Sequence, residues 1–302
     1  MAIKHNNNPP LVSIIMNCYN GEYYVAQAIQ SVLNQTYKNF EIIFWDNHSN
    51  DKSAIICKSF KDKRLKYYYA AKHTSLFEAR NLAIKKSKGR FIAFLDTDDF
   101  WNKTKLALQI SRFKNKKISL VYSNYYILNQ ITGLKRLAFK NEMPEGIVFK
   151  ELLKNYFIGM VTVVLKKDIF TKNKELFNSK YNIIGDFDLF TRISRNFNFA
   201  YIHSPLATYR VHNMSTTNNN YQLHVNELKL WINNQKSFNK KFLFFIEERI
   251  LFMEALINIL NKNYLNSIEK IFKISSFKKK IKLFIFLLIP NFILKLLKSN
   301  FS

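Results

Sequence analysis

The run Asp96-Thr97-Asp98-Asp99 places three carboxylates within four residues, directly after an apolar stretch. In an extended segment, side chains two residues apart point the same way, so Asp96 and Asp98 should converge while Asp99 faces elsewhere. Carboxylate oxygens suit Mg²⁺ or Mn²⁺, which usually keep positions open for a substrate phosphate. A solvated acidic turn before a helix is the alternative, and the basic chain around this cluster favours a cation site.

A second polar segment, Asp46–Asp51, also follows an apolar run. The side-chain amide of Asn47 has both an acceptor and donors, which could match the N3–H and O4 of a uracil. Ser49, Asn50 or Asp51 could instead cap the next helix. Both interpretations can hold together, on different residues.

Two later motifs carry acidic or basic groups. In GDFDLF, Asp186 stands at a predicted helix start, and Asp186 and Asp188 cannot share one helix face, so only one can reach a given substrate atom. The helix dipole alone would also favour an acidic residue there. In YRVH, alternation puts Arg210 and His212 on one side, where they could face a diphosphate or a metal, although a lone histidine is often structural.

These motifs follow predicted elements that alternate regularly. Apolar runs predict buried strands, and amphipathic periods predict helices between them. The expected strands are Leu11–Met16, Phe40–Trp45, Leu65–Ala70 and Phe91–Leu95, and the expected helices are Tyr24–Gln35, Lys52–Phe60 and Phe77–Lys86. This alternation predicts an α/β fold with a mostly parallel, Rossmann-like sheet flanked by helices, whose ligands bind at the carboxyl ends of the strands.

The middle of the chain is mixed in pattern. It predicts strands at 120–128 and 161–165, a short helix at 186–195, and two strand ends at 201–203 and 208–211.

Composition excludes several classes of protein. The chain has 302 residues, 48% of apolar types, and a net charge of +26, so it is not disordered and its partners should be anionic. Cys18 and Cys57 are expected to be free thiols, because two cysteines cannot staple a chain of this size. The first residues lack the apolar core of a signal peptide, so a cytoplasmic location is expected.

The last ninety residues differ from the rest. Helical patterns dominate from 215 to 302, and no acidic residue follows Glu269. From 273 onward, lysines stand among apolar residues that Pro290, Asn291 and Lys295 interrupt, which predicts a basic amphipathic stretch on an anionic membrane surface. A terminal helix that packs on the core is the alternative. The expected domains are a tail at 1–10, a domain at 11–214 with halves at 11–100 and 101–214, and the helical region at 215–302.

Taken together, the chain resembles the family 2 glycosyltransferases, which have the GT-A fold, and in particular those of bacterial surface polysaccharides. The resemblance covers about Val12 to His212, and its four stretches occur in the family's order. They are VSIIMNCYNGEYYVAQAIQSVLNQTYKNFEIIFWDNHSND, ARNLAIKKSKGRFIAFLDTDD, GDFDLFTRI and YRVH. It implies inverting transfer of a sugar from a nucleotide diphospho-sugar, with Mg²⁺ or Mn²⁺.

The resemblance also implies residue roles on the donor side. Asn17 and Tyr19 should border the nucleotide pocket, Asp46 and Asn47 should contact the base, and Arg80 should lie near the donor. Asn47 stands where the family often has an aspartate, which leaves the base open among uracil, thymine and guanine.

The remaining implied roles belong to ribose, metal and acceptor. Asp96 should reach the ribose, and Asp98, Asp99 and His212 should hold the metal on the diphosphate. Asp186 matches the general base. The family often has Glu-Asp where Gly185-Asp186 stands, so Asp188 stays open as the alternative base.

The expected enzyme is a hexosyltransferase that uses a UDP-hexose donor and a hydroxyl of a glycan or lipid-linked glycan, for lipopolysaccharide or capsule synthesis. It should be peripheral at the inner face of the cell membrane and should bind no nucleic acid; its oligomeric state is open. The alternative function is a non-enzymatic, basic nucleic-acid-binding protein, which would leave the acidic cluster unexplained.

Overall fold

The computed structural model describes residues 9–172, 176–213, 220–235, 238, 240–290 and 294. Most of the expected tail at 1–10, the expected boundary at 214/215, and Lys295 lie outside the described residues. The chain forms two compact units. The first consists of Met1–Val148, Phe157–Asn182 and Arg192–Arg210, and the second of Phe149–Tyr156, Ile183–Thr191 and Val211–Ser302.

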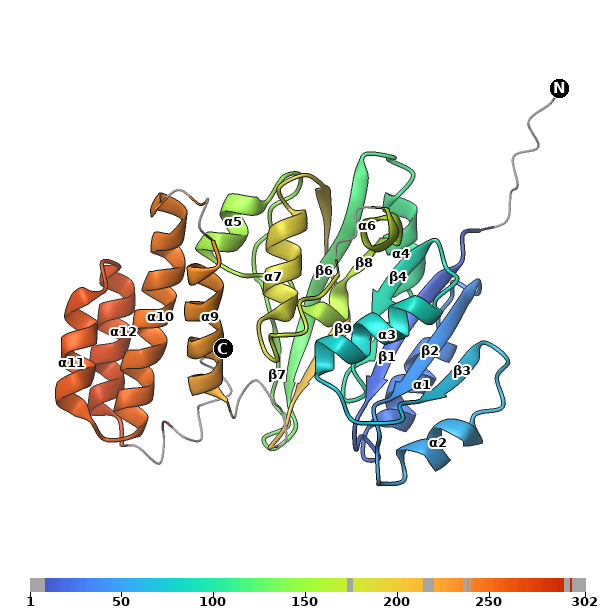
Figure 1. The fold of residues 1–302 in the computed structure, drawn as a ribbon, viewed down its shortest axis with the longest axis horizontal. Coiled ribbons are helices and arrows are strands. Elements are labelled where there is room, and N and C mark those ends of the chain that lie inside the picture. The colour runs from blue at the N-terminus through green and yellow to red at the C-terminus, as the bar shows by residue number, and fades with distance from the viewer. Residues whose placement is uncertain are drawn as a thin grey trace. The chain divides into compact units, whose positions relative to one another are not determined.

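The first unit contains a parallel sheet with the strand order β3-β2-β1-β4. Buried apolar side chains on both faces explain why β1, β2 and β4 are mostly apolar in sequence rather than alternating. Figure 1 shows the helices that alternate with these strands. The bounds are β1 (Val12–Cys18), α1 (Val25–Leu33), β2 (Phe40–Asp46), α2 (Ser53–Ser59), β3 (Leu65–Tyr69), α3 (Leu76–Lys86) and β4 (Phe91–Phe94), each within two residues of the predicted range.

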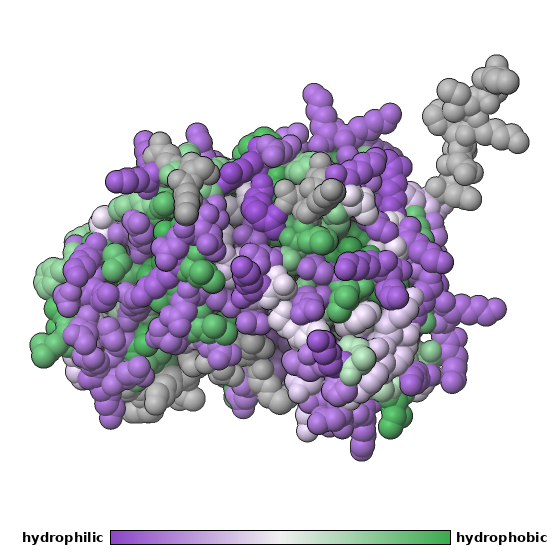
Figure 2. Space-filling view, viewed as in Figure 1, coloured by the Kyte–Doolittle hydropathy of each residue, from purple (hydrophilic) through white to green (hydrophobic). Residues whose placement is uncertain are grey.

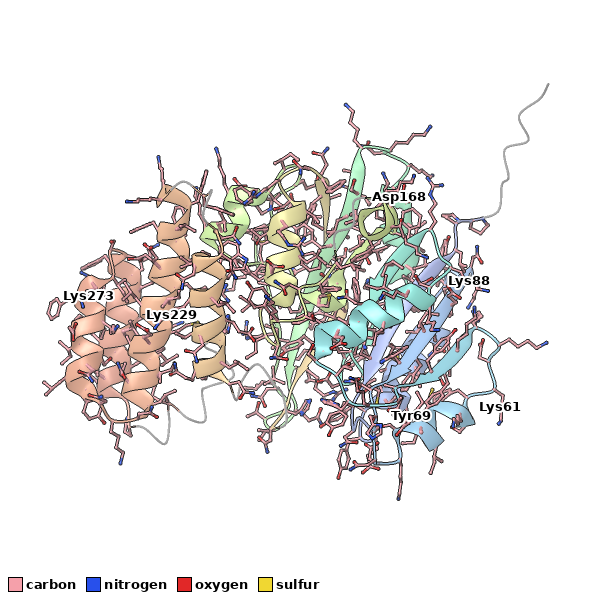
Figure 3. The ribbon with its side chains drawn as sticks, viewed as in Figure 1. Lys61, Tyr69, Lys88, Asp168, Lys229 and Lys273 are labelled. Carbon is pink, nitrogen blue, oxygen red and sulfur yellow. The ribbon has the colours of Figure 1, made fainter. Side chains whose placement is uncertain are left out.

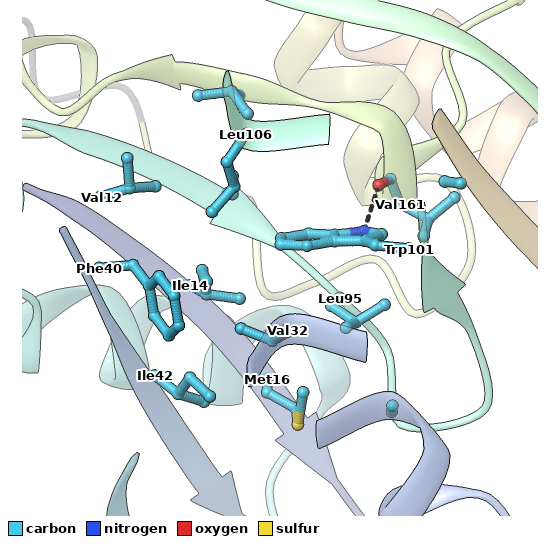
Figure 4. Packing of buried hydrophobic residues seen from close by; sticks show 14 of the residues in the cluster. Val12, Ile14, Met16, Val32, Phe40, Ile42, Leu95, Trp101, Leu106 and Val161 are labelled. Carbon is cyan, nitrogen blue, oxygen red and sulfur yellow. Dashed lines mark hydrogen bonds between the residues drawn. The ribbon is translucent and has the colours of Figure 1, made fainter. Parts of the chain in front are cut away.

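Helices cover both faces of this parallel part, as predicted. Helix α1 packs against the face that carries Ile14 and Met16 of β1, in a cluster that includes Trp101 (Figure 4). On the opposite face, Phe77 of α3 and Phe94 of β4 both contact the ring of Phe177.

The second half of the sheet is antiparallel, which the sequence did not predict. Strands β8 and β6 extend the sheet beyond β4, and β9, β5 and β7 complete it. Two predictions need correction. The strand expected at 161–165 is a 3-10 turn followed by β8, and the two strand ends expected at 201–203 and 208–211 belong to one long strand, β9. The bounds are β5 (Phe100–Trp101), α4 (Lys105–Arg112), β6 (Ile118–Asn129), β7 (Lys135–Leu137), η1 (Met160–Thr162), β8 (Val164–Lys166), α6 (Asp168–Thr171) and β9 (Asn198–Val211).

The second unit is helical. Buried Ala255, Leu256 and Ile271 form part of its apolar core. Within the described residues, no helix is both long and apolar enough to cross a membrane. The bounds are α5 (Phe149–Lys154), α7 (Gly185–Ile193), α9 (Tyr221–Asn233), α10 (Lys240–Leu260), α11 (Tyr264–Lys273) and α12 (Phe277–Leu288).

Trp101 offers a test of the core of the first unit. Its indole Nε1–H donates to the carbonyl oxygen of Val161 at 2.9 Å (Figure 4). We expect Trp101→Phe to lower the free energy of unfolding by about 1–3 kcal/mol more than Trp45→Phe, because it leaves a buried carbonyl unpaired. Trp45 is a matched control, since its buried Nε1 has no hydrogen-bond partner within the described part of the chain. Urea denaturation measures both, and equal losses would contradict the assigned role of this bond.

Candidate active site

The carboxyl ends of three strands meet at one edge of the parallel sheet. Strand pairing aligns Cys18 with Asp46, and the backbone N–H of Leu95 donates to the carbonyl of Ile15. Asn17 and Asp96 therefore lie at the same edge as Asp46. Asn17 is buried, and within the described residues neither polar atom of its side-chain amide has a hydrogen-bond partner. Such an orphaned amide is costly, and binding a polar ligand would satisfy it.

The loops that follow β1 and β2 are joined by hydrogen bonds. The backbone N–H of Gly21 donates to Ser53 Oγ at 2.9 Å, and that of Glu22 donates to Asp51 Oδ2 at 2.9 Å. A Cβ on Gly21 would lie 2.7 Å from Thr97 Oγ1, so only glycine allows this close approach to the Asp96–Asp99 segment. The loops that follow β1, β2 and β4 are therefore in direct contact at this edge of the sheet.

Asp46 and Asn47 are both buried and hold neighbouring loops. Asp46 accepts hydrogen bonds from Ser49 N–H at 2.8 Å and from the Tyr67 hydroxyl at 2.7 Å. The amide of Asn47 donates to the carbonyl of Thr74 at 2.8 Å, while its oxygen accepts from the Thr74 hydroxyl at 3.0 Å. The expected contacts of Asp46 and Asn47 with the nucleotide base stay predictions, because in this structure their polar atoms form hydrogen bonds with neighbouring segments of the chain.

Aromatic rings lie beside these loops. The exposed ring of Tyr19 packs on His73, with 4.2 Å between ring centroids. At the carboxyl end of β3, the hydroxyl of Tyr69 lies 3.1 Å from His48 Nδ1, and Figure 3 shows Tyr69 at this edge. An exposed tyrosine ring at such an edge can stack on a nucleobase.

Asp96 forms an ion pair with Arg80. The Nη2 of Arg80 donates to both carboxylate oxygens of Asp96, at 2.6 and 2.8 Å. Arg80 is buried, whereas Asp96 and Asp98 are only partly buried. The extended conformation expected for Asp96–Asp99 is wrong. The N–H of Asp99 donates to the carbonyl of Asp96 at 3.1 Å, which closes a turn, and the side chain of Asp99 is buried.

Arg210 fixes this turn from β9. Its backbone N–H donates to Asp99 Oδ1 at 2.8 Å, and its Nε donates to the carbonyl of Asp98 at 2.8 Å. Its guanidinium also donates hydrogen bonds to the side chains of Gln27 and Gln130, which belong to the same unit. Burial, and then the charges of Asp98 and Asp96, raise the pKa of Asp99 well above its usual range.

The second unit contains the other candidate carboxylate. Asp186 lies in the first turn of α7 and is partly exposed. The hydroxyl of Tyr156 donates to Asp186 Oδ2 at 2.8 Å, which orients the carboxylate. Sequence patterns gave no signal for Tyr156, since it stands alone and thirty residues away.

Asp188, two residues along the same helix, has a different environment. It is buried and accepts a hydrogen bond from Trp231 Nε1 at 3.1 Å. Burial raises the pKa of Asp188 to about 6, and the Trp231 bond acts in the opposite direction. The two aspartates thus separate into a partly exposed group and a buried group, as the helix geometry predicts.

Helices α9 and α10 support the start of α7. Glu227 of α9 is buried, and its Oε2 accepts from the N–H groups of Ile183 and Ile184, at 2.9 and 3.0 Å. The guanidinium of Arg249 of α10 lies over the ring of Phe187. Burial lowers the pKa of Arg249, and the charges of Tyr156 and Asp186 act in the opposite direction.

His212 follows the end of β9 and is also assigned to the second unit. The described residues contain no cluster of three or more histidine, cysteine or acidic side chains able to hold a metal. The roles of His212, Asp98 and Asp99 as metal ligands therefore stay predictions.

The family model described as Glycosyl transferase family 2 matches residues 13–192, which is more than half of the chain. The chain belongs to this family. This membership makes the protein a glycosyltransferase and sets aside the non-enzymatic alternative.

Curated relatives place this family 2 glycosyltransferase in the surface-polysaccharide group. One, from Escherichia coli, is UDP-Glc:alpha-D-GlcNAc-diphosphoundecaprenol beta-1,3-glucosyltransferase WfgD, 36% identical over 70% of this chain and 81% of the relative. Another is the putative teichuronic acid biosynthesis glycosyltransferase TuaG of Bacillus subtilis, 30% identical over 72% of this chain and 85% of the relative.

Solved structures confirm the GT-A fold. TarS of S. aureus, residues 1–349 in complex with UDP-GlcNAc, aligns with a TM-score of 0.64 and 16% identity, over 87% of this chain and 81% of that one. The mannosyltransferase PcManGT of Pyrobaculum calidifontis, in complex with GDP-Man and Mn²⁺, aligns with a TM-score of 0.63 and 13% identity, over 97% of this chain and 85% of that one.

The burial of Asp188 predicts a pH-dependent stability. Its folded-state pKa of about 6 lies above the usual 3.8, so its ionised form destabilises the fold by up to about 3 kcal/mol. This loss is absent below about pH 4 and complete above about pH 6. Asp188→Asn should still accept from Trp231 and should therefore gain stability relative to wild type as the pH rises through that window.

Chemical denaturation from pH 4 to pH 8 measures this difference. The control is Asp168→Asn, which removes an exposed carboxylate paired with Lys172 and should change stability little at any pH (Figure 3). A difference between Asp188→Asn and wild type that does not vary with pH would contradict the raised pKa.

Proposed function

We propose that this family 2 glycosyltransferase moves a hexose from a UDP-sugar to a hydroxyl of a lipid-linked glycan, with inversion at the anomeric carbon. The observation that carries the donor part is the polar edge of the parallel sheet. There the buried amide of Asn17, which has no hydrogen-bond partner among the residues that the structure describes, lies at the same edge as the partly buried carboxylates of Asp96 and Asp98.

The donor nucleotide would bind across this edge. Tyr19 offers an exposed ring for the base, and Asn17 offers both a donor and an acceptor. Arg80 holds Asp96 in one orientation, which pre-organises its carboxylate toward a ribose hydroxyl. The UDP-Glc donor named for the Escherichia coli relative supports UDP as the nucleotide.

A divalent cation, Mg²⁺ or Mn²⁺, fits the residues at this edge. Such ions often use one or two carboxylates together with substrate phosphates and water, so a complete protein cage is not needed. Asp98 is the suitable ligand, because it is partly exposed whereas Asp99 is buried against Arg210. When bound, the cation would stabilise the charge that develops on the leaving diphosphate.

Asp186 is the proposed general base. It would accept the proton of the acceptor hydroxyl while that oxygen attacks the anomeric carbon from the side opposite the diphosphate, whose C–O bond breaks. The hydroxyl of Tyr156 donates to one carboxylate oxygen and the backbone N–H of Phe187 donates to the other, both at 2.8 Å, and these two bonds fix the orientation of the carboxylate. Asp188 serves as a structural residue, because its carboxylate is buried against Trp231.

The Escherichia coli relative also supports the proposed acceptor and location. The Escherichia coli enzyme is named for a diphosphoundecaprenol-linked GlcNAc acceptor, and such lipids reside in membranes. We therefore place this enzyme in the cytoplasm, peripheral at the inner face of the cell membrane, where nucleotide sugars and lipid-linked glycans meet. Synthesis of lipopolysaccharide or capsule is the corresponding role.

A transfer assay with two matched variants tests the assignment. Asp186→Asn should lower kcat by about 10²–10⁴, the usual contribution of a general base, while donor binding is kept. Asp188→Asn makes the same chemical change two residues away and should keep turnover within a few-fold of wild type. The readout is label transfer from UDP-glucose to a lipid diphosphate-linked GlcNAc. Normal turnover in Asp186→Asn, with loss in Asp188→Asn, would make Asp188 the base.

A further inference from the structure

Helices α11 and α12 of the second unit each carry two apolar faces. The inner faces contribute Ile271, Leu283 and Phe286 to a buried cluster with residues of α10. The outer face of α12 consists of positions that recur at helical spacing and are all exposed: Phe277, Ile281, Phe284, Ile285 and Leu288. A helix packed only on its own core would present polar residues there.

The outer faces of the two helices form one surface. On α11, Leu265 and Phe272 are exposed and lie seven residues apart, which places them on the same side. The rings of Phe272 and Phe284 contact each other edge to face, with 6.3 Å between centroids. We call the exposed residues of α11 and α12 together the outer apolar face: Leu265, Phe272, Phe277, Ile281, Phe284, Ile285 and Leu288. Figure 2 shows hydrophobic surface in the region where Figure 1 draws α11.

Lysines border this face. At 3.6 residues per turn, Lys278 and Lys280 fall on opposite sides of the apolar stripe of α12. Neither forms an ion pair within the part of the chain that the structure describes, whereas Lys273 pairs with Glu269 and Lys279 lies near Glu248. Since no acidic residue follows Glu269, the border of the face is positive.

We propose that the outer apolar face docks on an anionic lipid bilayer, with its apolar side chains at the boundary between headgroups and acyl chains. An apolar stripe flanked by lysines is the pattern of a helix that lies in the plane of a membrane surface, and each lysine near anionic lipid adds to the attraction.

A second copy of this chain is the competing occupant of the face. Pairing two copies through this face would bring Lys278 and Lys280 of both molecules together, and like charges across an interface oppose association. An anionic membrane instead complements the same lysines. The charge at the border therefore favours lipid over self-association.

Vesicle co-sedimentation of the full chain tests the proposal without any sugar nucleotide, so its outcome is independent of the proposed transferase site. Wild type should bind vesicles of phosphatidylcholine with phosphatidylglycerol more tightly than vesicles of phosphatidylcholine alone, and salt should weaken that preference.

The decisive variant is Leu265→Glu with Leu288→Glu. These side chains are 83% and 85% exposed, so the fold should be unaffected, which circular dichroism and the unfolding midpoint check. Binding to the anionic vesicles should fall at least about tenfold, because the change removes two apolar contacts and adds repulsion. The matched control is Ile131→Glu with Leu134→Glu, at 68% and 73% exposure near β7, which adds the same charge and should leave binding unchanged.

Two results would overturn the proposal. One is equal vesicle binding by wild type and the Leu265→Glu/Leu288→Glu variant, or no binding by either. The other is a wild-type dimer in analytical ultracentrifugation that the variant converts to a monomer, since the occupant would then be a second copy. Lys278→Gln with Lys280→Gln should reduce the preference for phosphatidylglycerol, and an unchanged preference would count against the lysine border.

Discussion

The position of the Asp96–Asp99 turn depends on one buried arginine. Arg210 stands on β9, more than a hundred residues from the turn, and binds both the carbonyl of Asp98 and, through its backbone, the carboxylate of Asp99. Its guanidinium also lies over the rings of Tyr24 and Phe100, at 4.4 and 5.4 Å from their centroids. A hydrogen bond that involves a charged group commonly contributes about 1.5–3 kcal/mol, so the bond from the guanidinium to the Asp98 carbonyl stabilises this turn.

In each of the two acidic motifs, one aspartate is buried and another is partly exposed. In the first unit Asp99 is buried and holds the turn, while Asp98 is partly exposed. In the second unit Asp188 is buried against Trp231, while Asp186 is partly exposed and oriented by Tyr156. One carboxylate of each motif is thus buried against a fixed partner, and its neighbour is partly exposed. Rigid support of this kind is what a reactive group needs to keep its geometry.

Much of the parallel half of the fold could be predicted from the sequence. Apolar runs and helical periods located β1 to β4 and α1 to α3 because each element buries a face, and burial leaves a period in the sequence. The antiparallel half was harder to predict, because β8 and β5 are short and β9 contains exposed positions in its middle. The roles within each acidic motif could not be read locally either, since they depend on distant partners such as Arg210 and Trp231. The prediction of an extended Asp96–Asp99 segment was wrong because the bond between Asp99 and the distant Arg210 is not visible in the local sequence.

The edge formed by Asn17, Asp96 and Asp98 is proposed to bind a nucleoside diphosphate together with a divalent cation. The most direct measurement is the thermal unfolding midpoint with UDP, dTDP, GDP or CDP, each with and without Mn²⁺, for wild type and Asp98→Asn. Specific binding raises the midpoint by mass action. We expect a rise with UDP that needs Mn²⁺ in wild type and is lost in Asp98→Asn. No rise with any nucleotide, with or without the cation, would contradict the claim.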